Sequence, residues 1–380
     1  MKPSMVVIGA GSTGAAIAHD LALRGFGVTL VERFGPAAGT TGHNQAQLHS
    51  GARYAASDPE AARECLRENL ILRRLMPEAL ELNDGLFIAL TDEHLAYRRP
   101  FLEGCAACGI PAETIDPARA LQLEPRLNPG LKAAVRIPDG VFDPYRLTLS
   151  FIAGARAHGA QFLPFTEVTG INPQRGQVTL RRRAEGQTEA LGCDVIVNAA
   201  GPWAARVAGL AGLTLDLEPS AGVMATLDQR LCHMVINLLA PPADGDIIVP
   251  QRNTSILGTT SWRVDDPDDV PVPEAHIRQL LDMAEWMMPG ASRVPVRGVM
   301  AAARPLLRDP AGEGRAASRG FRCFDHAEAG APGFFSIVGG KTTTARYMAE
   351  KLSDLICARL GVDAPCRTQA EALPSYRLGL

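Results

Sequence analysis

The sequence has few cysteines, no long hydrophobic run and no marked excess of charge of one sign. Its 380 residues include eight cysteines, which is ordinary for a reduced compartment and too few for a disulfide scaffold. No apolar run approaches the roughly 20 residues of a transmembrane helix, so we expect no membrane-spanning segment. The net charge is −3 and the arginines are scattered, which argues against nucleic-acid binding. These absences favour a soluble, cytoplasmic enzyme.

The composition is that of a folded protein with a sizeable core. Hydrophobic residues make up 46% and charged residues 21%, which excludes disordered and collagen-like classes. The length suggests two or three domains at about 150 residues each. The apolar start, residues 5–18, resembles a signal peptide. It carries a glycine motif that cleavage would remove, so we interpret it as mature structure.

Cys105 and Cys108 form a lone C-x-x-C pair. The next cysteine is Cys193, so no second pair stands at zinc spacing. The pair lies where a helix is expected to end at Gly109. We therefore predict structural cysteines and no metal site.

Hydrophobic periodicity and turn residues place the secondary structure. Helices are expected where apolar residues recur at helical spacing, and strands where apolar and polar residues alternate or an apolar run is continuous. The expected strands cover 5–8, 28–32, 161–183, 194–198, 334–338 and most of 217–304; the expected helices cover 13–24, 58–75, 93–108, 117–123, 144–158, 273–288 and 342–360. The pattern predicts a doubly wound α/β domain interrupted by an antiparallel sheet domain.

Two helix starts have clear capping signals. Ser57 is the expected N-cap of the helix over 58–75, with Glu60 as its capping-box partner and Pro59 in the first turn. Asp143, which precedes Pro144, is expected to cap the helix that follows it.

A G-x-G-x-x-G motif lies between the first strand and the first helix. Gly9 permits the tight turn, Gly11 lets a pyrophosphate approach the backbone, and Gly14 lets the helix pack on the strand. The helix N-terminus then presents its positive end to the phosphates. Glu32 ends the second strand, where an acid binds ribose hydroxyls and repels the 2′-phosphate of NADP. A Rossmann-type dinucleotide-binding domain is predicted; a purely structural glycine turn is the alternative.

The sequence then resembles a known family. Residues 39–54 resemble the flavin-contacting stretch of the D-amino-acid-oxidase-like superfamily, and 49–54 are most similar to the catalytic subunit of anaerobic FAD-dependent glycerol-3-phosphate dehydrogenase. Further matches follow in order at 138–144, 197–203, 256–261, 304–306 and 339–341. The resemblance implies FAD as cofactor, an FAD-binding domain over 1–84, 138–215 and 330–380, and an inserted antiparallel-sheet (α+β) substrate or cap domain over 85–137 and 216–329.

The resemblance also implies cofactor contacts beyond the glycine motif. Gly339 and Gly340 precede a helix whose positive end would stabilise anionic reduced flavin, although a plain tight turn is the alternative. The full set of expected FAD contacts is Gly9, Gly11, Ser12, Thr13, Gly14, Glu32, Arg33, Thr40, Thr41, Asn44, Val168, Ala200, Gly201, Gly339, Gly340, Lys341 and Thr342.

Oxidation of a secondary alcohol by FAD requires a base and an anchor for the charged end of the substrate. The resemblance places His49 beside the flavin, and a reference pKa of about 6.5 suits a general base; a merely flavin-orienting histidine is the alternative. Arg53, Arg304 and Lys341 are the expected cations for a phosphate, and Tyr54 can add a hydroxyl donor. We also expect a catalytic contribution from Arg304, because it follows an uncharged run and should line a cavity. Ordinary solvated side chains, or Lys341 facing the flavin N1 region, are the alternatives.

Two features leave the substrate open. The family's catalytic subunit usually continues into a cysteine-rich C-terminal domain, which we do not find after Cys366, so a separate electron-transfer protein or quinone is expected, with membrane association through such a partner. Residues 41–44, ahead of His49, also resemble L-2-hydroxyglutarate dehydrogenase. The alternatives are therefore a 2-hydroxy-acid dehydrogenase or amine oxidase on the same scaffold, and a flavoprotein subunit that serves chiefly for assembly and electron relay.

Overall fold

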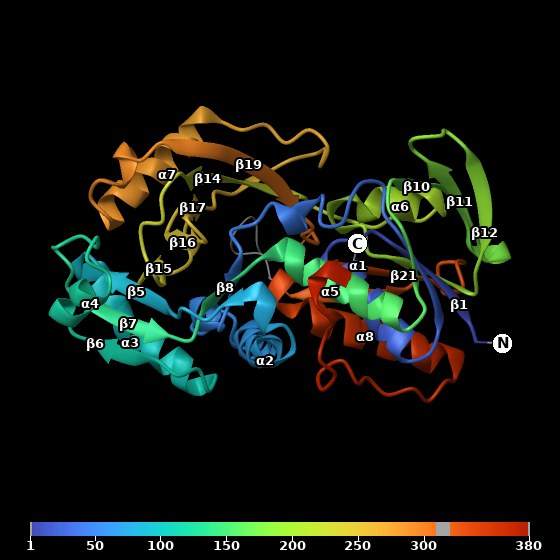
Figure 1. The fold of residues 1–380 in the computed structure, drawn as a ribbon, viewed down its shortest axis with the longest axis horizontal. Helices are drawn as coiled ribbons and strands as arrows, with labels where there is room; N and C mark the ends of the chain where they lie inside the picture. The colour runs from blue at the N-terminus through green and yellow to red at the C-terminus, as the bar shows by residue number, and fades with distance from the viewer. Residues whose placement is uncertain (1, 309–319, 379–380) are drawn as a thin grey trace.

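Two large sheets organise the molecule. The computed structural model describes residues 2–308 and 320–378, and contains a six-stranded sheet and a nine-stranded sheet. Figure 1 shows the nine-stranded sheet towards the left and the six-stranded sheet, with the N-terminus, towards the right. Small three-stranded sheets accompany them.

The six-stranded sheet has the order β20-β21-β13-β1-β2-β9. Its strands pair in parallel except β20, which pairs antiparallel with β21 at the edge. β20 falls within the range expected for the cap domain, yet it joins this sheet through β21. The strand bounds are β1 Ser4–Ile8, β2 Gly27–Val31, β9 Gln161–Leu163, β13 Val195–Asn198, β20 Phe321–Asp325 and β21 Phe334–Gly339.

Helices and a small sheet cover the two faces of this sheet. On one face, α1 (Ser12–Leu23), α5 (Pro144–Ala157) and α8 (Ala345–Leu360) pack together, as Figure 1 shows. On the other face, α6 (Ala204–Leu210) packs beside the sheet of β10 (Thr166–Asn172), β11 (Gln177–Arg182) and β12 (Thr188–Gly192). The strands are therefore buried on both sides, as their continuous apolar sequences predict.

The nine-stranded sheet follows the order β18-β14-β17-β16-β15-β5-β7-β6, with β19 paired to β14. Only the β5–β15 pair is parallel. Apolar side chains of α4 (Pro117–Leu123) and α7 (Glu274–Met287) cover one face, and those of α3 (Asp92–Ala107) pack on the other. The strands are β5 Gly85–Ala89, β6 Glu113–Ile115, β7 Ala133–Ile137, β14 Ser220–Leu227, β15 Val235–Leu238, β16 Ile247–Gln251, β17 Thr254–Gly258, β18 Trp262–Arg263 and β19 Val296–Arg304.

Short elements connect the two large sheets. β3 (Gln47–Leu48), β8 (Gly140–Phe142) and β4 (Leu80–Glu81) form a small antiparallel sheet, and α2 (Pro59–Leu75) runs beside it. Single 3-10 turns complete the chain: η1 Thr40–Gly42, η2 Ala52–Tyr54, η3 Pro77–Ala79, η4 Pro173–Arg175, η5 Gly201–Trp203, η6 Ala291–Arg293, η7 Thr342–Thr344 and η8 Tyr376–Leu378.

The predicted α/β architecture is confirmed, with one correction at a helix start. Asp58, not Ser57, is the N-cap of α2, and its side chain accepts a hydrogen bond from the Ala61 amide. The reason is that Pro59 occupies the first helical position, which makes the residue directly before it the cap. The Asp143 cap is confirmed, since its carboxylate accepts from the Tyr145 and Arg146 amides.

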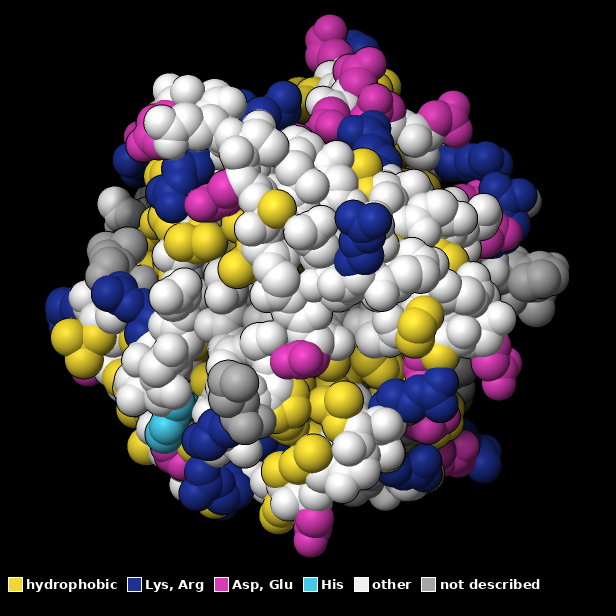
Figure 2. Space-filling model, turned by 90° about the vertical axis from the view of Figure 1, so that its right-hand side faces the viewer, with side chains coloured by type: hydrophobic (Ala, Val, Ile, Leu, Met, Phe, Trp, Pro, Cys, Tyr) yellow, Lys and Arg dark blue, Asp and Glu magenta, His cyan; other side chains and the backbone are white. Residues whose placement is uncertain are grey.

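The eight cysteines are thiols, and none forms a disulfide. Cys105 is fully buried in the apolar cluster beneath α3, and Cys108 caps the end of that helix. Their structural assignment is thus consistent with the fold. On the face drawn in Figure 2, basic side chains are interspersed with acidic and apolar ones rather than gathered into a patch.

Candidate active site

A cavity of about 1410 Å³ lies between the two large sheets. It exceeds the roughly 300–1,000 Å³ of ordinary ligand pockets, as an elongated dinucleotide with an adjoining substrate requires. Every residue predicted to contact cofactor or substrate lines it except Gly14. The structure therefore brings together segments that the sequence separates by more than 300 residues.

The glycine motif forms a cradle that side chains would fill. A Cβ on Gly9, whose φ is +102°, would lie 2.8 Å from the Ala199 carbonyl oxygen. A Cβ on Gly14 would lie 1.8 Å from the Gly9 carbonyl oxygen, so Gly14 acts by letting α1 pack on the loop rather than by lining the cavity. The N-cap of α1 is Gly11, which has no side chain to cap the helix, and Gly11, Ser12 and Thr13 at this amide end line the cavity. These residues fit a bound pyrophosphate.

The predicted ribose-binding acid lies next to this cradle. The Glu32 carboxylate accepts hydrogen bonds from the Ala10 amide at 2.8 Å and the Phe34 amide at 2.9 Å. Burial raises its pKa, and these hydrogen bonds act in the opposite direction. Val168 of β10, and Ala200 with Gly201 after β13, line the cavity nearby.

Residues 40–44 are held by contacts within the chain. The Thr40 hydroxyl donates to the Ala303 carbonyl oxygen at 2.6 Å, and the Asn44 side-chain amide donates to the Thr41 carbonyl oxygen at 2.6 Å. The Thr41 hydroxyl accepts from the Ser12 amide at 3.0 Å. This stretch therefore forms a fixed wall between the glycine cradle and β19.

The Gly339–Gly340 turn requires glycine at both positions. Their φ values are +90° and +76°, and a Cβ on Gly340 would lie 2.3 Å from the Met348 sulfur. Lys341 follows, and its ammonium lies 4.5 Å from the centroid of the Tyr54 ring, a cation–π contact. This turn, which precedes η7 and α8, thus lines the cavity with backbone and places a cation there.

His49 and Tyr54 adjoin each other at the same end of the cavity. Their ring centroids are 5.6 Å apart. Burial lowers the pKa of His49 to about 3, and the positive charges of Lys341 and Arg53 add to the shift. The imidazole is therefore neutral at physiological pH, and its low pKa makes it a weak base in the absence of ligand.

Arg53 is buried against a carboxylate that the sequence analysis missed. Its Nη2 donates to both oxygens of Asp246, at 2.7 and 2.8 Å, and to the Ala243 carbonyl oxygen at 3.2 Å. Its Nη1 is buried and has no hydrogen-bond acceptor among the residues that the structure describes. A buried donor of this kind favours a ligand that can accept from it.

Arg304 is held by uncharged oxygens. Its Nη1 donates to the Ser220 and Ala221 carbonyl oxygens, and its Nη2 to the Thr259 hydroxyl and the Thr260 carbonyl oxygen. Gly222 makes room for this arrangement, because a Cβ there would lie 2.4 Å from both Arg304 Nη2 and the Thr259 hydroxyl oxygen. These contacts within the chain fix the guanidinium of Arg304 at the cavity wall.

Sequence reasoning missed the residues that support these side chains. Asp246 and Gly222 had no motif to mark them, and Thr259 lay in the matched segment 256–261 but was assigned no role; the only signal for Asp246 was an acidic Asp-Gly-Asp turn at 244–246. Asp268 was also missed, although it binds Arg33 at 2.7 Å. Among the described residues, no three His, Cys, Asp or Glu side chains gather as a metal site, and no helix is long and apolar enough to cross a membrane.

Comparisons with known proteins identify FAD-dependent oxidoreductases as relatives of this chain. A family model described as FAD dependent oxidoreductase (DAO) matches residues 4–353. The chain is 43% identical over 377 residues to a subunit of the anaerobic glycerol-3-phosphate dehydrogenase of Escherichia coli K12, covering 97% of this chain and 70% of that one. It is 40% identical to the subunit of the same name in Haemophilus influenzae, covering 98% and 68%.

Solved structures of an oxidase and a dehydrogenase share the fold of this chain. A glycine oxidase from Geobacillus kaustophilus superposes with a TM-score of 0.78 at 21% identity, covering 98% of this chain and 99% of that chain. A glycerol-3-phosphate dehydrogenase from Bacillus halodurans, complexed with FAD, superposes with a TM-score of 0.73 at 25% identity, covering 98% and 68%. The chain therefore belongs to the DAO family of FAD-dependent oxidoreductases.

Proposed function

We propose that this protein oxidises sn-glycerol 3-phosphate to dihydroxyacetone phosphate with FAD as the electron acceptor. One observation carries the proposal. A neutral histidine and three cationic side chains line the same cavity as the dinucleotide cradle: His49, Arg53, Arg304 and Lys341. The names of the relatives that are 40–43% identical to this chain support the same substrate.

The cofactor follows from the family and fits the cradle. Gly9, Gly11 and the start of α1 would hold the pyrophosphate, Glu32 the ribose, and the 339–342 turn the flavin end. Bound FAD supplies the two-electron acceptor that takes a hydride from the alcohol carbon.

The cations would anchor the substrate phosphate. A phosphate monoester carries nearly two negative charges and is best held by several cations with directed donors. The buried Nη1 of Arg53 offers directed donors, while Lys341 and Arg304 add positive charge at the same cavity. A carboxylate substrate needs fewer positive charges, which favours the phosphate ester over a 2-hydroxy acid.

His49 would remove the hydroxyl proton. The O–H proton passes to the neutral imidazole as the C–H hydride leaves, so the alcohol loses two electrons and becomes a ketone. Burial is the larger cause of the lowered pKa of His49, and a phosphate near Arg53 and Lys341 would offset the smaller part that comes from their charges, so the base would strengthen when substrate binds.

The electrons would then leave through another protein or a quinone. The relatives are named as subunits, which supports a partner. We propose a cytoplasmic protein that associates with the membrane through such a partner, and co-purification with an iron–sulfur protein tests this.

The decisive test is anaerobic reduction of the flavin. We expect sn-glycerol 3-phosphate to bleach the absorbance near ~450 nm, the band lost when FAD is reduced. Bleaching by L-2-hydroxyglutarate or an amino acid, but not by sn-glycerol 3-phosphate, would move the function to the alternatives.

Arg53→Ala should raise the substrate KM at least about tenfold. Arg63→Ala, an exposed arginine on α2, is the matched control with an unchanged KM.

A further inference from the structure

Asp246 contacts Arg53, which lines the cavity, but does not line the cavity itself. The carboxylate is 1% exposed and the arginine 6% exposed, so water competes little for their contact. Both carboxylate oxygens accept from the same nitrogen, Nη2, and none of the contacts described for Arg53 involves Nη1. The hydrogen bonds described for the guanidinium therefore all come from Nη2.

Asp246 is itself fixed by the backbone around it. Its Oδ2 accepts from the Ala243 amide at 3.0 Å, and its carbonyl oxygen accepts from the Leu238 amide at 3.1 Å. These bonds anchor it in the loop between β15 and β16, two neighbouring strands in the middle of the nine-stranded sheet (Figure 1). The carboxylate is thus a rigid acceptor rather than a mobile counter-ion.

The pair also joins two parts of the chain that the fold brings together. Arg53 lies in η2, just before α2, and Asp246 lies 193 residues later in the nine-stranded sheet. Pro242 and Ile247, on either side of the Asp246 loop, line the cavity with Arg53. The orientation of Arg53 is consequently set by a distant part of the chain and not by its own short element.

We propose that Asp246 is a positioning residue for substrate binding, which holds Arg53 by Nη2 so that Nη1 is presented to the anionic group of the substrate. The inference rests on the proposed function, in which Arg53 binds the phosphate. Loss of the carboxylate releases the guanidinium to other rotamers, and the directed donors are lost even though the positive charge remains.

Two variants separate orientation from charge. Asp246→Asn keeps the shape but replaces one of the two acceptor oxygens by an NH2 group, which donates and cannot accept from Arg53; one oxygen is left to serve both Arg53 and the Ala243 amide. Asp246→Glu keeps the charge and moves the carboxylate by one methylene. If Asp246 only balances charge, Asp246→Glu should have wild-type anion affinity and Asp246→Asn should bind anions more tightly. If Asp246 positions Arg53, both variants should bind anions more weakly.

The measurement uses the FAD-loaded protein and inorganic phosphate as probe. Phosphate affinity is read from the perturbation of the flavin spectrum, without turnover, and the KM and kcat for sn-glycerol 3-phosphate are measured beside it. We expect phosphate affinity to fall, and KM to rise, by about tenfold or more in both Asp246 variants, with a smaller change in kcat. Arg53→Ala with Asp246→Asn should be no worse than Arg53→Ala alone.

Asp20→Asn is the matched control. Asp20 is a fully buried aspartate that accepts from Arg24 Nε at 2.9 Å, and neither residue lines the cavity. It should lose thermal stability and keep its phosphate affinity. Wild-type phosphate affinity in Asp246→Glu, or tighter binding in Asp246→Asn, would overturn the positioning role. If the wild-type protein itself bound no phosphate and was not reduced by sn-glycerol 3-phosphate, the proposed function would fail instead.

Discussion

At the scale of single residues, the protonation state of His49 is the feature with the clearest kinetic consequence. Burial, together with Lys341 and Arg53, lowers its pKa to about 3. The sign is that of a base available at neutral pH: the imidazole is unprotonated above its lowered pKa and becomes protonated only as the pH falls through it. The reference value near 6.5, which motivated the sequence prediction, therefore does not describe the unliganded site.

This predicts different pH profiles for kcat/KM and kcat. The acid limb of kcat/KM, which reports the free enzyme, should lie well below pH 6.5 once the substrate's own phosphate ionisation near ~6 is accounted for. The limb of kcat should lie at higher pH, because the bound phosphate offsets the neighbouring cations. His49→Ala should lower kcat by about 10²- to 10⁴-fold while FAD stays bound. An acid limb of kcat/KM at pH 6.5 would contradict the depressed pKa.

Gly222 gives a second prediction at this scale. A methyl group there would lie 2.4 Å from Arg304 Nη2 and from the Thr259 hydroxyl oxygen, so both must move. Gly222→Ala should raise the KM for the phosphate ester about tenfold and leave the FAD content near that of the wild type. Gly298→Ala is the matched control on the paired strand, because nothing lies within 4 Å of its added Cβ. Equal kinetics for the two variants would show that the placement of Arg304 does not matter.

At the scale of elements, a segment between β18 and α7 crosses from the nine-stranded sheet to the FAD cradle. We call residues 264–270 the strap. Asp268 accepts from Arg33 at 2.7 Å, from Trp203 Nε1 at 2.8 Å and from Arg206 at 2.5 Å, and Asp266 also contacts Arg206. Strap residues line the cavity beside Glu32, where the adenosine half of FAD should lie.

The strap should therefore slow FAD release in a salt-dependent way. Its carboxylates are about half exposed, at 43% for Asp268, so each ion pair is weak and screened. Asp268→Asn should release FAD about threefold to tenfold faster, as followed by flavin fluorescence, and salt should accelerate release from the wild type more than from the variant. Asp265→Asn is the control within the strap and should change little, because Asp265 is 96% exposed.

Acid should act on the strap in the same direction. Burial raises the pKa of Asp268, but hydrogen bonds from Arg33, Arg206 and Trp203 outweigh it and leave the pKa below its usual value. A depressed carboxylate pKa stabilises the strap above the ordinary aspartate range and loses that contribution as the pH falls through the lowered value. FAD release that did not respond to the Asp268 variant, to salt or to acid would exclude this function for the strap.

The elements were largely predictable from the sequence, and the contacts between them were not. Periodicity and glycine signals located α1, α3, α4 and α7 within about two residues, because local propensity and tertiary packing agree there. The Ser57 cap failed by one residue because Pro59 sits first in its helix. The Asp246 and Asp268 contacts could not be derived, since no local signal states which distant acid meets Arg53 or Arg33.

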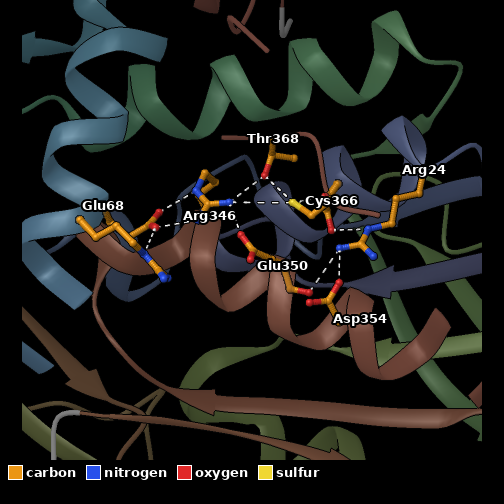
Figure 3. Close-up of polar contacts among 9 residues, drawn as sticks. Arg24, Glu68, Arg346, Glu350, Asp354, Cys366 and Thr368 are labelled. Carbon is orange, nitrogen blue, oxygen red and sulfur yellow. Dashed lines mark hydrogen bonds and ion pairs between the residues drawn. The ribbon is translucent and has the colours of Figure 1, made fainter. Parts of the chain in front are cut away.

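At the scale of the whole molecule, a buried ionic network links four parts of the chain. Arg346 of α8 donates to both oxygens of Glu68 in α2, at 2.7 Å each, and to Glu350 and Thr368. Cys366 connects this cluster to Asp20 of α1. Figure 3 shows the network passing from Glu68 through Arg346 to Cys366 and Arg24. It ties α2, which follows Arg53 and Tyr54, to α8, which follows Lys341.

The Glu68–Arg346 pair, which joins α2 to α8 and does not include Asp20 of α1, predicts linked losses of stability and substrate affinity. Glu68 and Arg346 are at most 1% exposed, so Arg346→Met leaves the buried Glu68 carboxylate with only the half-exposed Arg67, at 3.4 Å, as a cation. The free energy of unfolding should fall by about 3–5 kcal/mol. Glu68→Met combined with Arg346→Met should recover most of that loss, since no uncompensated charge remains. Urea unfolding at a fixed excess of FAD measures the free energy of unfolding of the single and the double variant.

The exposed pair of Arg359 and Asp325 provides the control. Arg359 is 53% exposed, and Arg359→Met should cost no more than about 1 kcal/mol. If α2 and α8 need this ion pair to keep Arg53 and Lys341 at one phosphate site, Arg346→Met should also raise the substrate KM. The double variant restores stability but not the ion pair, so its KM should stay raised. A double variant with wild-type KM would show that the network serves stability alone, and that Asp246 and the cavity walls suffice to place the cations.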